Sequence, residues 1–380
     1  MTDLEHILPL WHELEASGGN YVLATVVAVE GPSYRKPGAR MLIAQDGRRA
    51  GTVSGGCLEA EVARRAWWRT ESGPVVERYS TVEDDGDMPY GSGCGGVVYL
   101  LLERRATAAA LLTALEDAFK RRAPLAIATV LEGEHIGQRA FAGLQREDDS
   151  EMNAATDPTR VGLRNLAELA FARGACIEKK ILIDEMETRA WADYRAARPG
   201  LWIFGAGDDA KPLVHLAREL GWFVGVAEGR SHLATRERFR TADVVKTLPI
   251  ADFPGTAAAQ LDLRPTDAAV VMTHSFEQDS RILASLLALE YPLAYVGVLG
   301  PQRRTNELLS EAARLLNLPH PTDCAERWLA QMHAPTGIDL GAETPATIAL
   351  SIVAEIQQTI AAASAQPLCK VRAVSTIATT

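Results

Sequence analysis

The feature that most constrains the fold is a glycine-rich turn that joins a short apolar segment to an amphipathic one. Leu201–Phe204 are four consecutive apolar residues, and residues 205–210, with the sequence GAGDDA, follow the pattern G-x-G-x-x-A. Apolar residues then recur at helical spacing from Leu213 to Leu220, and Gly221 stands where a helix would end. A strand, a glycine-rich turn and a helix in this order predict the first unit of a parallel sheet that binds a nucleotide.

The same alternation of strand and helix continues along the back half of the chain. Apolar segments end at Glu228, at His274 and at Gly300, with helical patterns between them. Because the carboxyl ends of parallel strands share one edge of a sheet, these positions should line one ligand crevice with the glycine-rich turn. Glu228 lies 23 residues after Gly205, where an acid would accept a hydrogen bond from a ribose hydroxyl. We predict a Rossmann-like doubly wound parallel-sheet domain, whose candidate ligand residues are Gly205, Gly207, Glu228, His274 and Gly300.

The front half has a different pattern. A strand rich in valine and alanine, Tyr21–Val29, precedes the loop Glu30–Gly38, in which two prolines and two glycines exclude regular structure. A second strand, Arg40–Ala44, follows, and a helix is predicted for Leu58–Trp68. A second glycine-rich loop, Gly91–Gly96, leads into another apolar strand. These features predict a glycine-rich α/β domain that is separate from the Rossmann-like one.

One short stretch of the front half is repeated. Residues 126–133, AIATVLEG, echo residues 22–27, VLATVV, and each stretch is followed by a glycine and then by an arginine. These are Gly38 and Arg40 after the first stretch, and Gly137 and Arg139 after the second. The match indicates a duplicated strand–loop–strand segment.

The length of the chain allows two domains of ordinary size, because it has 380 residues, of which 47% are hydrophobic and 23% charged. The segment 193–200 ends in Arg-Pro-Gly and has the composition of a linker. The predicted organisation is an N-terminal domain over residues 1–192, the linker 193–200, the Rossmann-like domain 201–361 and a tail 362–380.

The charge balance and the cysteine content limit the classes of function. Lys and Arg total 39 against 49 Asp and Glu, and the net charge of -10 argues against bulk binding to nucleic acid or to an anionic membrane. The first residues form an amphipathic helical pattern rather than a signal peptide, and no apolar run is long enough to span a bilayer. The five cysteines are dispersed without a C-x-x-C pair, which argues against a disulfide framework or a structural zinc site. We therefore expect a soluble protein of the reducing cytoplasm.

Cys57 is the candidate reactive residue. It follows Ser54–Gly56 and immediately precedes a predicted helix, where exposed N–H groups and the positive helix end favour the thiolate. A thiolate is a soft ligand for molybdenum and a carrier of sulfur, and glycines let a bulky ligand approach the backbone. Cys94 lies similarly between Gly93 and Gly95. The alternative for both cysteines is a small buried apolar residue in a tight turn.

Three basic residues, Arg35, Lys36 and Arg40, lie in or beside the first loop of an otherwise acidic chain. Such a cluster suits a phosphate or pyrophosphate group. The alternative is that these residues belong to a solvated surface loop. His274 is open to two interpretations as well, because a histidine at this position serves either as an acid–base group or as a hydrogen-bonded structural residue.

Seven stretches of sequence, spread over nearly the whole chain, form a recognisable set. They are Glu30–Arg40, Gly51–Glu59 with the sequence GTVSGGCLE, Gly93–Gly96, Gly205–Ala210, Met272–His274 with Asp279, Tyr295–Arg304, and Gly337–Pro345 with the sequence GIDLGAETP. In this order they resemble the XdhC/CoxI family of molybdenum cofactor maturation factors, which serve xanthine dehydrogenase-type enzymes. The SGGCLE and GIDLGAETP stretches are specific in combination.

The resemblance implies a chaperone without turnover of its own. Such a protein binds the molybdenum cofactor, as molybdopterin or its dinucleotide form, protects it and hands it to a xanthine dehydrogenase-type molybdoenzyme. The resemblance also implies a homodimer and a cysteine desulfurase as a partner, with no role for nucleic acid or a membrane. The cofactor-binding residues in the N-terminal domain are then Arg35, Arg40, Ser54, Gly55, Gly56, Cys57, Glu59 and Cys94, with Cys57 as the contact to molybdenum or sulfur. We also expect the Rossmann crevice, with Gly205, Gly207, Glu228, His274 and Gly300, to contribute to binding of the pterin cofactor. Asp208, Glu228 and Pro301 depart from the residues that the family often has at these positions.

Two other functions are open at this point. The first is an NAD(P)-dependent oxidoreductase, in which His274 would transfer a proton and Glu228 would hold the ribose. Against it, no Lys–His or Tyr–Lys pair is visible near the Rossmann strands, and the SGGC loop would be unexplained. The second is a regulatory protein that senses NAD or another nucleotide.

Overall fold

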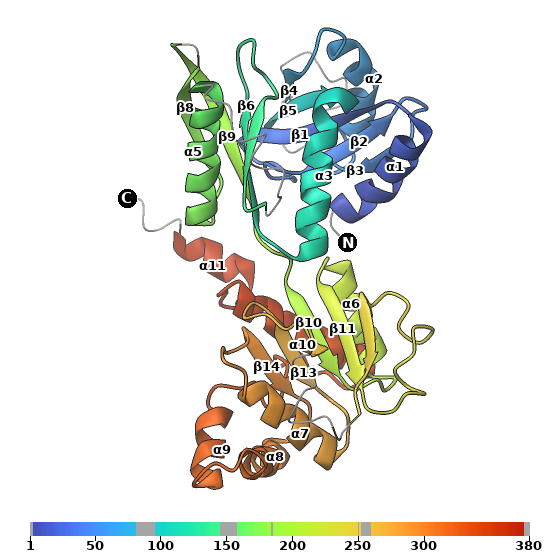
Figure 1. Ribbon diagram of the computed structural model, residues 1–380, viewed down its shortest axis with the longest axis vertical. Coiled ribbons are helices and arrows are strands. Elements are labelled where there is room, and N and C mark those ends of the chain that lie inside the picture. Colours follow the sequence, from blue (N-terminus) through green and yellow to red (C-terminus); the bar gives the residue numbers. More distant parts are fainter. Residues whose placement is uncertain are drawn as a thin grey trace. The chain divides into compact units, whose positions relative to one another are not determined.

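In the computed structural model the chain forms two compact units, Met1–Arg198 and Pro199–Thr380. The structure describes residues 3–80, 96–144, 158–183, 185–249, 251 and 260–375. Figure 1 labels the helices and strands of both units. The strands that flank the boundary are β9 (Met186–Arg195) and β10 (Gly200–Phe204).

The N-terminal unit contains two antiparallel sheets. The first has the strand order β3-β2-β1-β5-β4, and helix α3 (Arg105–Arg121) leads from it to the second. The elements of the first sheet and its helices are α1 (Asp3–Ser17), β1 (Tyr21–Glu30), β2 (Arg40–Ala44), β3 (Arg49–Gly51), α2 (Glu59–Arg69), β4 (Val75–Ser80) and β5 (Val97–Arg104). The second sheet has the order β7-β6-β9-β8 and consists of β6 (Leu125–Val130), β7 (Arg139–Ala142), β8 (Ile177–Ile183) and β9, with α5 (Pro158–Arg173) between β7 and β8.

Strand β1 is buried on both faces over most of its length, which explains its nearly uninterrupted apolar sequence. Successive side chains of a strand point to opposite faces of the sheet. Tyr21 and Leu23 therefore pack with α1 and α3 on one face, while Val22 and Ala24 pack with α2 on the other. In the second sheet, apolar residues of β6 pack with α5, which lies along that sheet in Figure 1.

The two sheets are copies of one arrangement. In each copy a first hairpin, β1–β2 or β6–β7, pairs through its first strand with the last strand of a second hairpin, β4–β5 or β8–β9. The bends correspond as well. Gly38 donates its N–H to the carbonyl of Val26 at 2.7 Å with φ 92°, and Gly137 donates to Val130 at 3.0 Å with φ 85°. The repeated stretch of sequence therefore belongs to a duplication of the whole β-β-α-β-β unit.

Two buried ion pairs join the copies. Arg40, at the start of β2, bonds Asp193 of β9 at 2.7 Å, and Arg139, at the start of β7, bonds Glu103 of β5 at 2.6 Å. The strand registers place the two arginines at corresponding positions of the two copies, and the two acids likewise. In each pair the arginine comes from one copy and the acid from the other. An isolated copy would therefore contain a buried arginine and a buried acid without their partners.

The C-terminal unit is a parallel sheet with the strand order β12-β11-β10-β13-β14, which confirms the predicted Rossmann-like fold. After β10 its elements are α6 (Ala210–Glu219), β11 (Phe223–Glu228), β12 (Val244–Thr247), β13 (Ala268–Val271), α7 (Phe276–Leu287), β14 (Tyr295–Val298), α8 (Gln302–Leu315), α9 (Pro321–Leu329), α10 (Pro345–Ile360) and α11 (Leu368–Ser375). The chain order β10-β11-β12 runs outward to one side and β13-β14 to the other, so the strand order reverses beside β10. Such a reversal is where ligands bind in folds of this kind.

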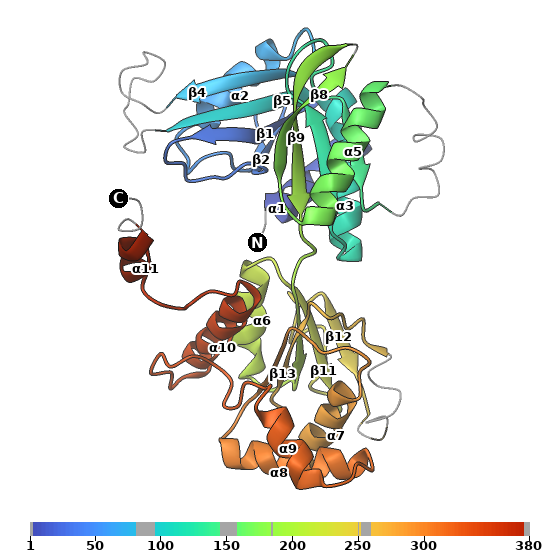
Figure 2. The same ribbon diagram turned by 90° about the vertical axis from the view of Figure 1, so that its left-hand side faces the viewer.

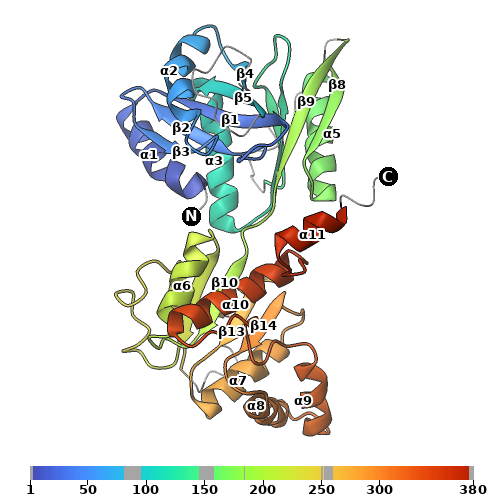
Figure 3. The same ribbon diagram turned by 180° about the vertical axis from the view of Figure 1, so that it is seen from behind.

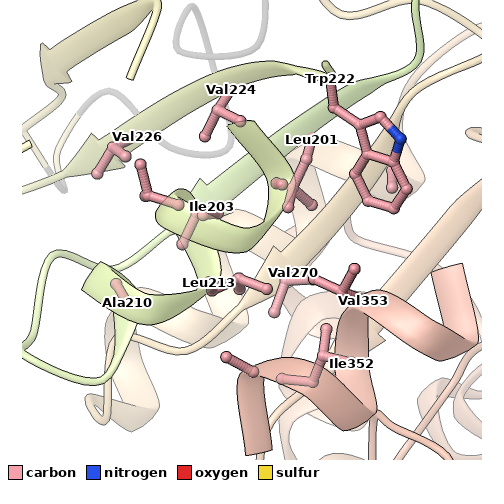
Figure 4. Packing of buried hydrophobic residues seen from close by; sticks show 14 of the residues in the cluster. Leu201, Ile203, Ala210, Leu213, Trp222, Val224, Val226, Val270, Ile352 and Val353 are labelled. Carbon is pink, nitrogen blue, oxygen red and sulfur yellow. The ribbon is translucent and has the colours of Figure 1, made fainter. Parts of the chain in front are cut away.

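Helices cover both faces of this sheet. On one face α6 and α10 pack on the central strands, where Figure 4 shows Leu213 and Ile352 close to Val270. Figures 2 and 3 show α6 and α10 together on that side. On the other face α7 and α8 bury Phe204 and Val271. Because both faces are covered, the strands are continuous apolar runs rather than alternating ones. No helix within the described ranges is both long and apolar enough to cross a membrane.

Candidate functional site

Three loops of the N-terminal unit meet at one edge of the first sheet. They are residues 31–39 between β1 and β2, residues 52–58 between β3 and α2, and Gly96, which directly precedes β5. A Cβ on Gly96 would overlap the carbonyl oxygen of Pro32, and a Cβ on Gly55 would lie 3.5 Å from the ring of Tyr34. We call residues 31–39, 52–58 and Gly96 the three-loop site. Cys94 lies outside the described residues.

Ser54 and Glu59 tie the loop before α2 together. The hydroxyl of Ser54 donates to Glu59 Oε2 at 2.6 Å, and the N–H of Ser54 donates to Glu59 Oε1 at 2.8 Å. The same hydroxyl oxygen accepts the N–H groups of Gly56 at 3.2 Å and Leu58 at 3.1 Å. Burial raises the pKa of Glu59, but the hydrogen bonds from Ser54 and the backbone outweigh it, so this pKa lies below its ordinary value. The loop is therefore held around a buried, ionised carboxylate.

The outer side of this loop is exposed. Gly55, Gly56 and Cys57 are all exposed, and Gly56 has φ 114° with open space where a Cβ would stand. Cys57 Sγ lies 3.6 Å from Ser54 Oγ, and α2 begins two residues later at Glu59. Because the thiol is exposed, the alternative of a small buried apolar residue does not describe Cys57.

Positive charge gathers beside the three-loop site. Arg35 forms an ion pair with Asp3, and its pKa is lowered first by burial and then by the charge of Arg195, while Glu59 acts in the opposite direction. Arg195 bonds Asp193 at 2.9 Å and the carbonyl of Gly38. Sequence reasoning missed Arg195, because its segment was predicted as a linker. The alternating pattern of residues 186–195 was the signal that this segment is a strand.

Arg40, the other predicted phosphate ligand in this region, is buried beneath the site. Its guanidinium bonds Asp193 and also donates to the carbonyl of Gly38 at 2.9 Å. Burial lowers its pKa to about 10, against the opposing effect of Asp193. In this structure Arg40 joins the two copies of the duplicated unit, and its role as a cofactor ligand stays a prediction.

The predicted crevice residues of the C-terminal unit lie together at the carboxyl edge of its sheet. A Cβ on Gly205 would stand 2.5 Å from the carbonyl oxygen of Met272, so only glycine fits this approach of β10 to β13. Glu228 has a fully buried carboxylate that accepts the N–H of Ala206 at 3.1 Å. The backbone N–H and two guanidinium nitrogens of Arg230 also donate to this carboxylate, at 2.9 to 3.1 Å. Glu228, the predicted acceptor for a ribose hydroxyl, therefore already accepts hydrogen bonds from Ala206 and Arg230.

His274 forms the other part of this crevice. It has φ 63°, which is uncommon for a residue with a side chain, and its Nε2 lies 2.7 Å from Asp209 Oδ2. The carboxylate of Asp209 also covers Gly207, because a Cβ there would overlap it. Gly300, with φ 125°, lies beside the side chain of Arg304. The charged side chains described here, Glu228 with Arg230 and His274 with Asp209, are thus paired with each other.

Comparison with protein families matches both units. Residues 14–80 match the model described as the XdhC and CoxI family. Residues 201–356 match the model described as the XdhC Rossmann domain. The first range contains the hairpin β1–β2 and the loop with Cys57, and the second contains all five predicted crevice residues.

Several known proteins are similar over nearly the whole chain. A protein of Bacillus subtilis (strain 168), described as a probable subunit of xanthine dehydrogenase, is 32% identical over 340 residues, which cover 89% of this chain and 92% of that protein. The molybdenum cofactor insertion chaperone PaoD of Escherichia coli (strain K12) is 27% identical over 365 residues, which cover 93% and 88%. A crystal structure from Bacillus halodurans, described as a xanthine dehydrogenase, is 28% identical with a TM-score of 0.67 and covers 97% of this chain and 98% of that one.

Proposed function

Because this chain belongs to the XdhC and CoxI family, we propose that it binds the molybdenum cofactor, shields it and passes it to a xanthine dehydrogenase-type molybdoenzyme. Its similarity to a molybdenum cofactor insertion chaperone supports a role in molybdenum cofactor maturation. Its similarity to a probable component of xanthine dehydrogenase supports that class of enzyme as the recipient. In this role the chain performs no reaction of its own, and its residues hold, orient and release the cofactor. A homodimer and a cysteine desulfurase partner stay predictions of the family resemblance.

The observation that carries this proposal is the exposed thiol of Cys57 on a tightly bonded glycine loop. The hydrogen bonds between Ser54 and Glu59 set the shape of the loop and leave its outer side open. A thiolate is a soft ligand that suits a molybdenum centre. Among the described residues, no atom lies within 4 Å of the point where a Cβ of Gly56 would stand, so a ligand can approach the backbone beside the thiol. These residues therefore fit the cofactor.

The cations beside the loop fit the phosphate of a pterin cofactor. Lys36 is exposed, and Arg35 and Arg195 would have to share with a phosphate the donors that already pair with Asp3 and Asp193. Guanidinium and ammonium groups bind phosphate through short charge-assisted hydrogen bonds. When bound, the cofactor supplies the metal and the sulfur atoms that the recipient enzyme uses. The chain supplies the thiol of Cys57, the cations and the exposed backbone of Gly55 and Gly56.

The crevice of the C-terminal unit gives less support to an NAD(P)-dependent oxidoreductase. Both oxygens of Glu228 are already bonded by Arg230 and Ala206, so a ribose would have to displace them. The carboxylate of Asp209 covers Gly207, where a diphosphate would approach the start of α6 and would meet a like charge. Steady oxidation of NADH with a small carbonyl substrate would favour this alternative over cofactor maturation.

The substitution Cys57→Ser tests the proposal. Serine keeps the size and the hydrogen bond to Ser54 but removes the soft thiolate, so the variant should fold normally and bind the cofactor weakly. We expect the recipient enzyme to stay inactive when it is reconstituted with this variant. Thermal melting, titration with molybdenum cofactor released from a molybdoenzyme, and reconstitution of the recipient measure the three properties on one preparation.

Cys369→Ser is the matched control for this experiment. Cys369 is another exposed free thiol, in α11 of the C-terminal unit, and its replacement should leave all three measurements at the wild-type level. A well-folded Cys57→Ser protein with wild-type cofactor binding and wild-type activation of the recipient would contradict the proposed role of the thiol.

A further inference from the structure

Tyr34 is the most exposed large apolar side chain among the described residues, with 77% of its surface open to solvent. Single exposed apolar residues are common and need no functional explanation. The place of this one is unusual, because its ring lies against Gly55 in the three-loop site, two residues before Cys57. An aromatic ring kept in solvent beside a candidate ligand-binding loop is an available stacking surface.

Comparison of the two copies in the duplicated unit shows that Tyr34 belongs to an addition. Gly38 follows Val26 by twelve residues, whereas the corresponding Gly137 follows Val130 by only seven. The longer first loop carries Tyr34 together with Arg35 and Lys36, and the shorter second loop, residues 131–136, carries neither an aromatic residue nor a lysine or arginine. The β-β-α-β-β arrangement that the two copies share therefore does not depend on the ring of Tyr34.

A second connection at the same edge of the first sheet is also longer in the first copy than in the second. Strands β4 and β5 are joined by residues 81–96, whereas the corresponding strands β8 and β9 are joined by residues 184–185. The register of β1 with β5 pairs Glu30 with Val97, so this connection ends at the edge at which the Tyr34 loop begins. Of the two copies, only the first has the SGGC loop. The two additions that the structure describes, the loop with Tyr34 and the SGGC loop, approach each other at Tyr34 and Gly55.

We infer that Tyr34 binds the flat conjugated ring of the pterin by stacking, an inference that rests on the proposed function. A Cβ on Gly55 would lie 3.5 Å from the base of the tyrosine ring, and 77% of the Tyr34 surface is open to solvent. The ring is therefore accessible to a flat heteroaromatic group, which aromatic side chains bind by stacking. Tyr34 would hold the pterin ring on the loop that also carries Arg35, whose guanidinium would bind the phosphate, and next to Gly55 of the loop that carries Cys57. Tyr34 would therefore act as a positioning residue for the cofactor beside the thiol.

The test replaces the ring in the full-length protein. Tyr34→Leu keeps an apolar side chain without a stacking face, and we expect cofactor affinity to fall about 5- to 100-fold, the range that one stacking contact of this kind contributes. Tyr34→Phe keeps the stacking face and should bind within about twofold of wild type.

A second probe, 6-hydroxymethylpterin, has the ring without phosphate or metal, and quenching of its fluorescence reports stacking directly. We expect quenching by wild type, Tyr34→Phe and Cys57→Ser, but not by Tyr34→Leu.

Trp68→Leu is the matched control, because Trp68 is also highly exposed, in the last turn of α2 at the opposite end of the helix from Cys57. It should bind both probes as wild type does. If Tyr34→Leu binds the cofactor normally while Cys57→Ser does not, the stacking inference is wrong and the proposed function stands. The same conclusion follows if Tyr34→Leu binds normally but fails to activate the recipient enzyme, since Tyr34 would then contact that enzyme. If the wild-type protein binds no cofactor, the stacking inference and the proposed function are both wrong.

Discussion

Glu59 shows how a single buried carboxylate shapes the loop that presents a thiol. Its oxygens accept the N–H groups of Val53 at 3.2 Å and Ser54 at 2.8 Å and the hydroxyl of Ser54. Through that hydroxyl it also fixes the N–H groups of Gly56 and Leu58. These bonds curl the backbone so that Cys57 stands outside and the carboxylate inside. The glutamate of the SGGCLE stretch therefore shapes the loop that presents the cysteine, and its role as a cofactor ligand stays a prediction.

We expect Glu59→Gln to disturb the loop. The glutamine amide presents N–H donors to a set of groups that need an acceptor, so at least one of these hydrogen bonds is lost. The free energy of unfolding should fall by about 1–3 kcal/mol, and cofactor binding should weaken. Urea denaturation and cofactor titration measure the two effects. Glu61→Gln is the control on the same helix, because Glu61 forms ion pairs with Arg64 and Arg65, and its loss should cost less than about 1 kcal/mol. Equal effects of the two substitutions would speak against this role.

The same comparison has a defined pH dependence. The pKa of Glu59 is lower in the folded chain than its ordinary value, because hydrogen bonds from Ser54 and the backbone outweigh the effect of burial. Its ionised form therefore stabilises the fold fully above the unfolded pKa of about 4.3, and this contribution is lost as the pH falls through the lowered folded value. The difference in stability between wild type and Glu59→Gln should shrink below about pH 4.

At the scale of elements, the two exchanged ion pairs explain why the two sheets form one unit. Asp193 is buried with Arg40, whose charge, together with that of Arg195, lowers the pKa of Asp193 against the effect of burial. For Glu103 burial wins, and its pKa is raised although Arg139 opposes the shift. The two pairs correspond in position but differ in this balance: the second arginine near Asp193, Arg195, also hydrogen-bonds it, whereas the second arginine near Glu103, Arg40, acts on it through its charge alone.

This correspondence provides an internal control for the role of Arg40. Arg40→Lys and Arg139→Lys each keep a charge but lose the planar fork that reaches both the acid and a backbone carbonyl. We expect each to lower the free energy of unfolding by about 1–3 kcal/mol, with equal cofactor binding once the fraction of folded protein is taken into account. Weaker cofactor binding by Arg40→Lys alone would show that Arg40 contacts the cofactor, as the sequence predicts.

At the scale of the whole molecule, the sequence predicted the fold better than the contacts at its sites. The pattern of strand, glycine turn and helix at residues 201–220 depends only on local order, so it identified the parallel sheet and the crevice. The partners of Glu228 and Gly38 depend on how loops close. Arg230 folds back over Glu228, and Arg195 reaches Gly38 from a strand that begins 148 residues further along the chain. No periodicity in the sequence encodes such closures, so both arginines were found only in the structure.

Because the chain divides into two units, we expect the proposed cofactor site to be lost when the C-terminal unit is produced alone. The two hydrophobic cores around the parallel sheet consist only of residues after Pro199, so a fragment of residues 199–380 should fold and melt cooperatively. Because the three-loop site lies in the other unit, we expect this fragment to bind the molybdenum cofactor far more weakly than the full chain does. Circular dichroism and cofactor titration measure both properties. A folded fragment with full cofactor affinity would move the principal site to the crevice.

The duplicated frame also separates two demands that usually compete within one domain. The second copy supplies half of the buried charge pairs and its own hydrophobic core, but its β6–β7 and β8–β9 connections are shorter than the β1–β2 and β4–β5 connections of the first copy. Both copies thus contribute to the stability of the unit, whereas the proposed cofactor site lies in the first copy. A lineage that altered the loops of the first copy would change what the protein carries while leaving intact the scaffold that keeps it folded. We therefore expect one cofactor site in the N-terminal unit, although the sheet arrangement occurs twice there.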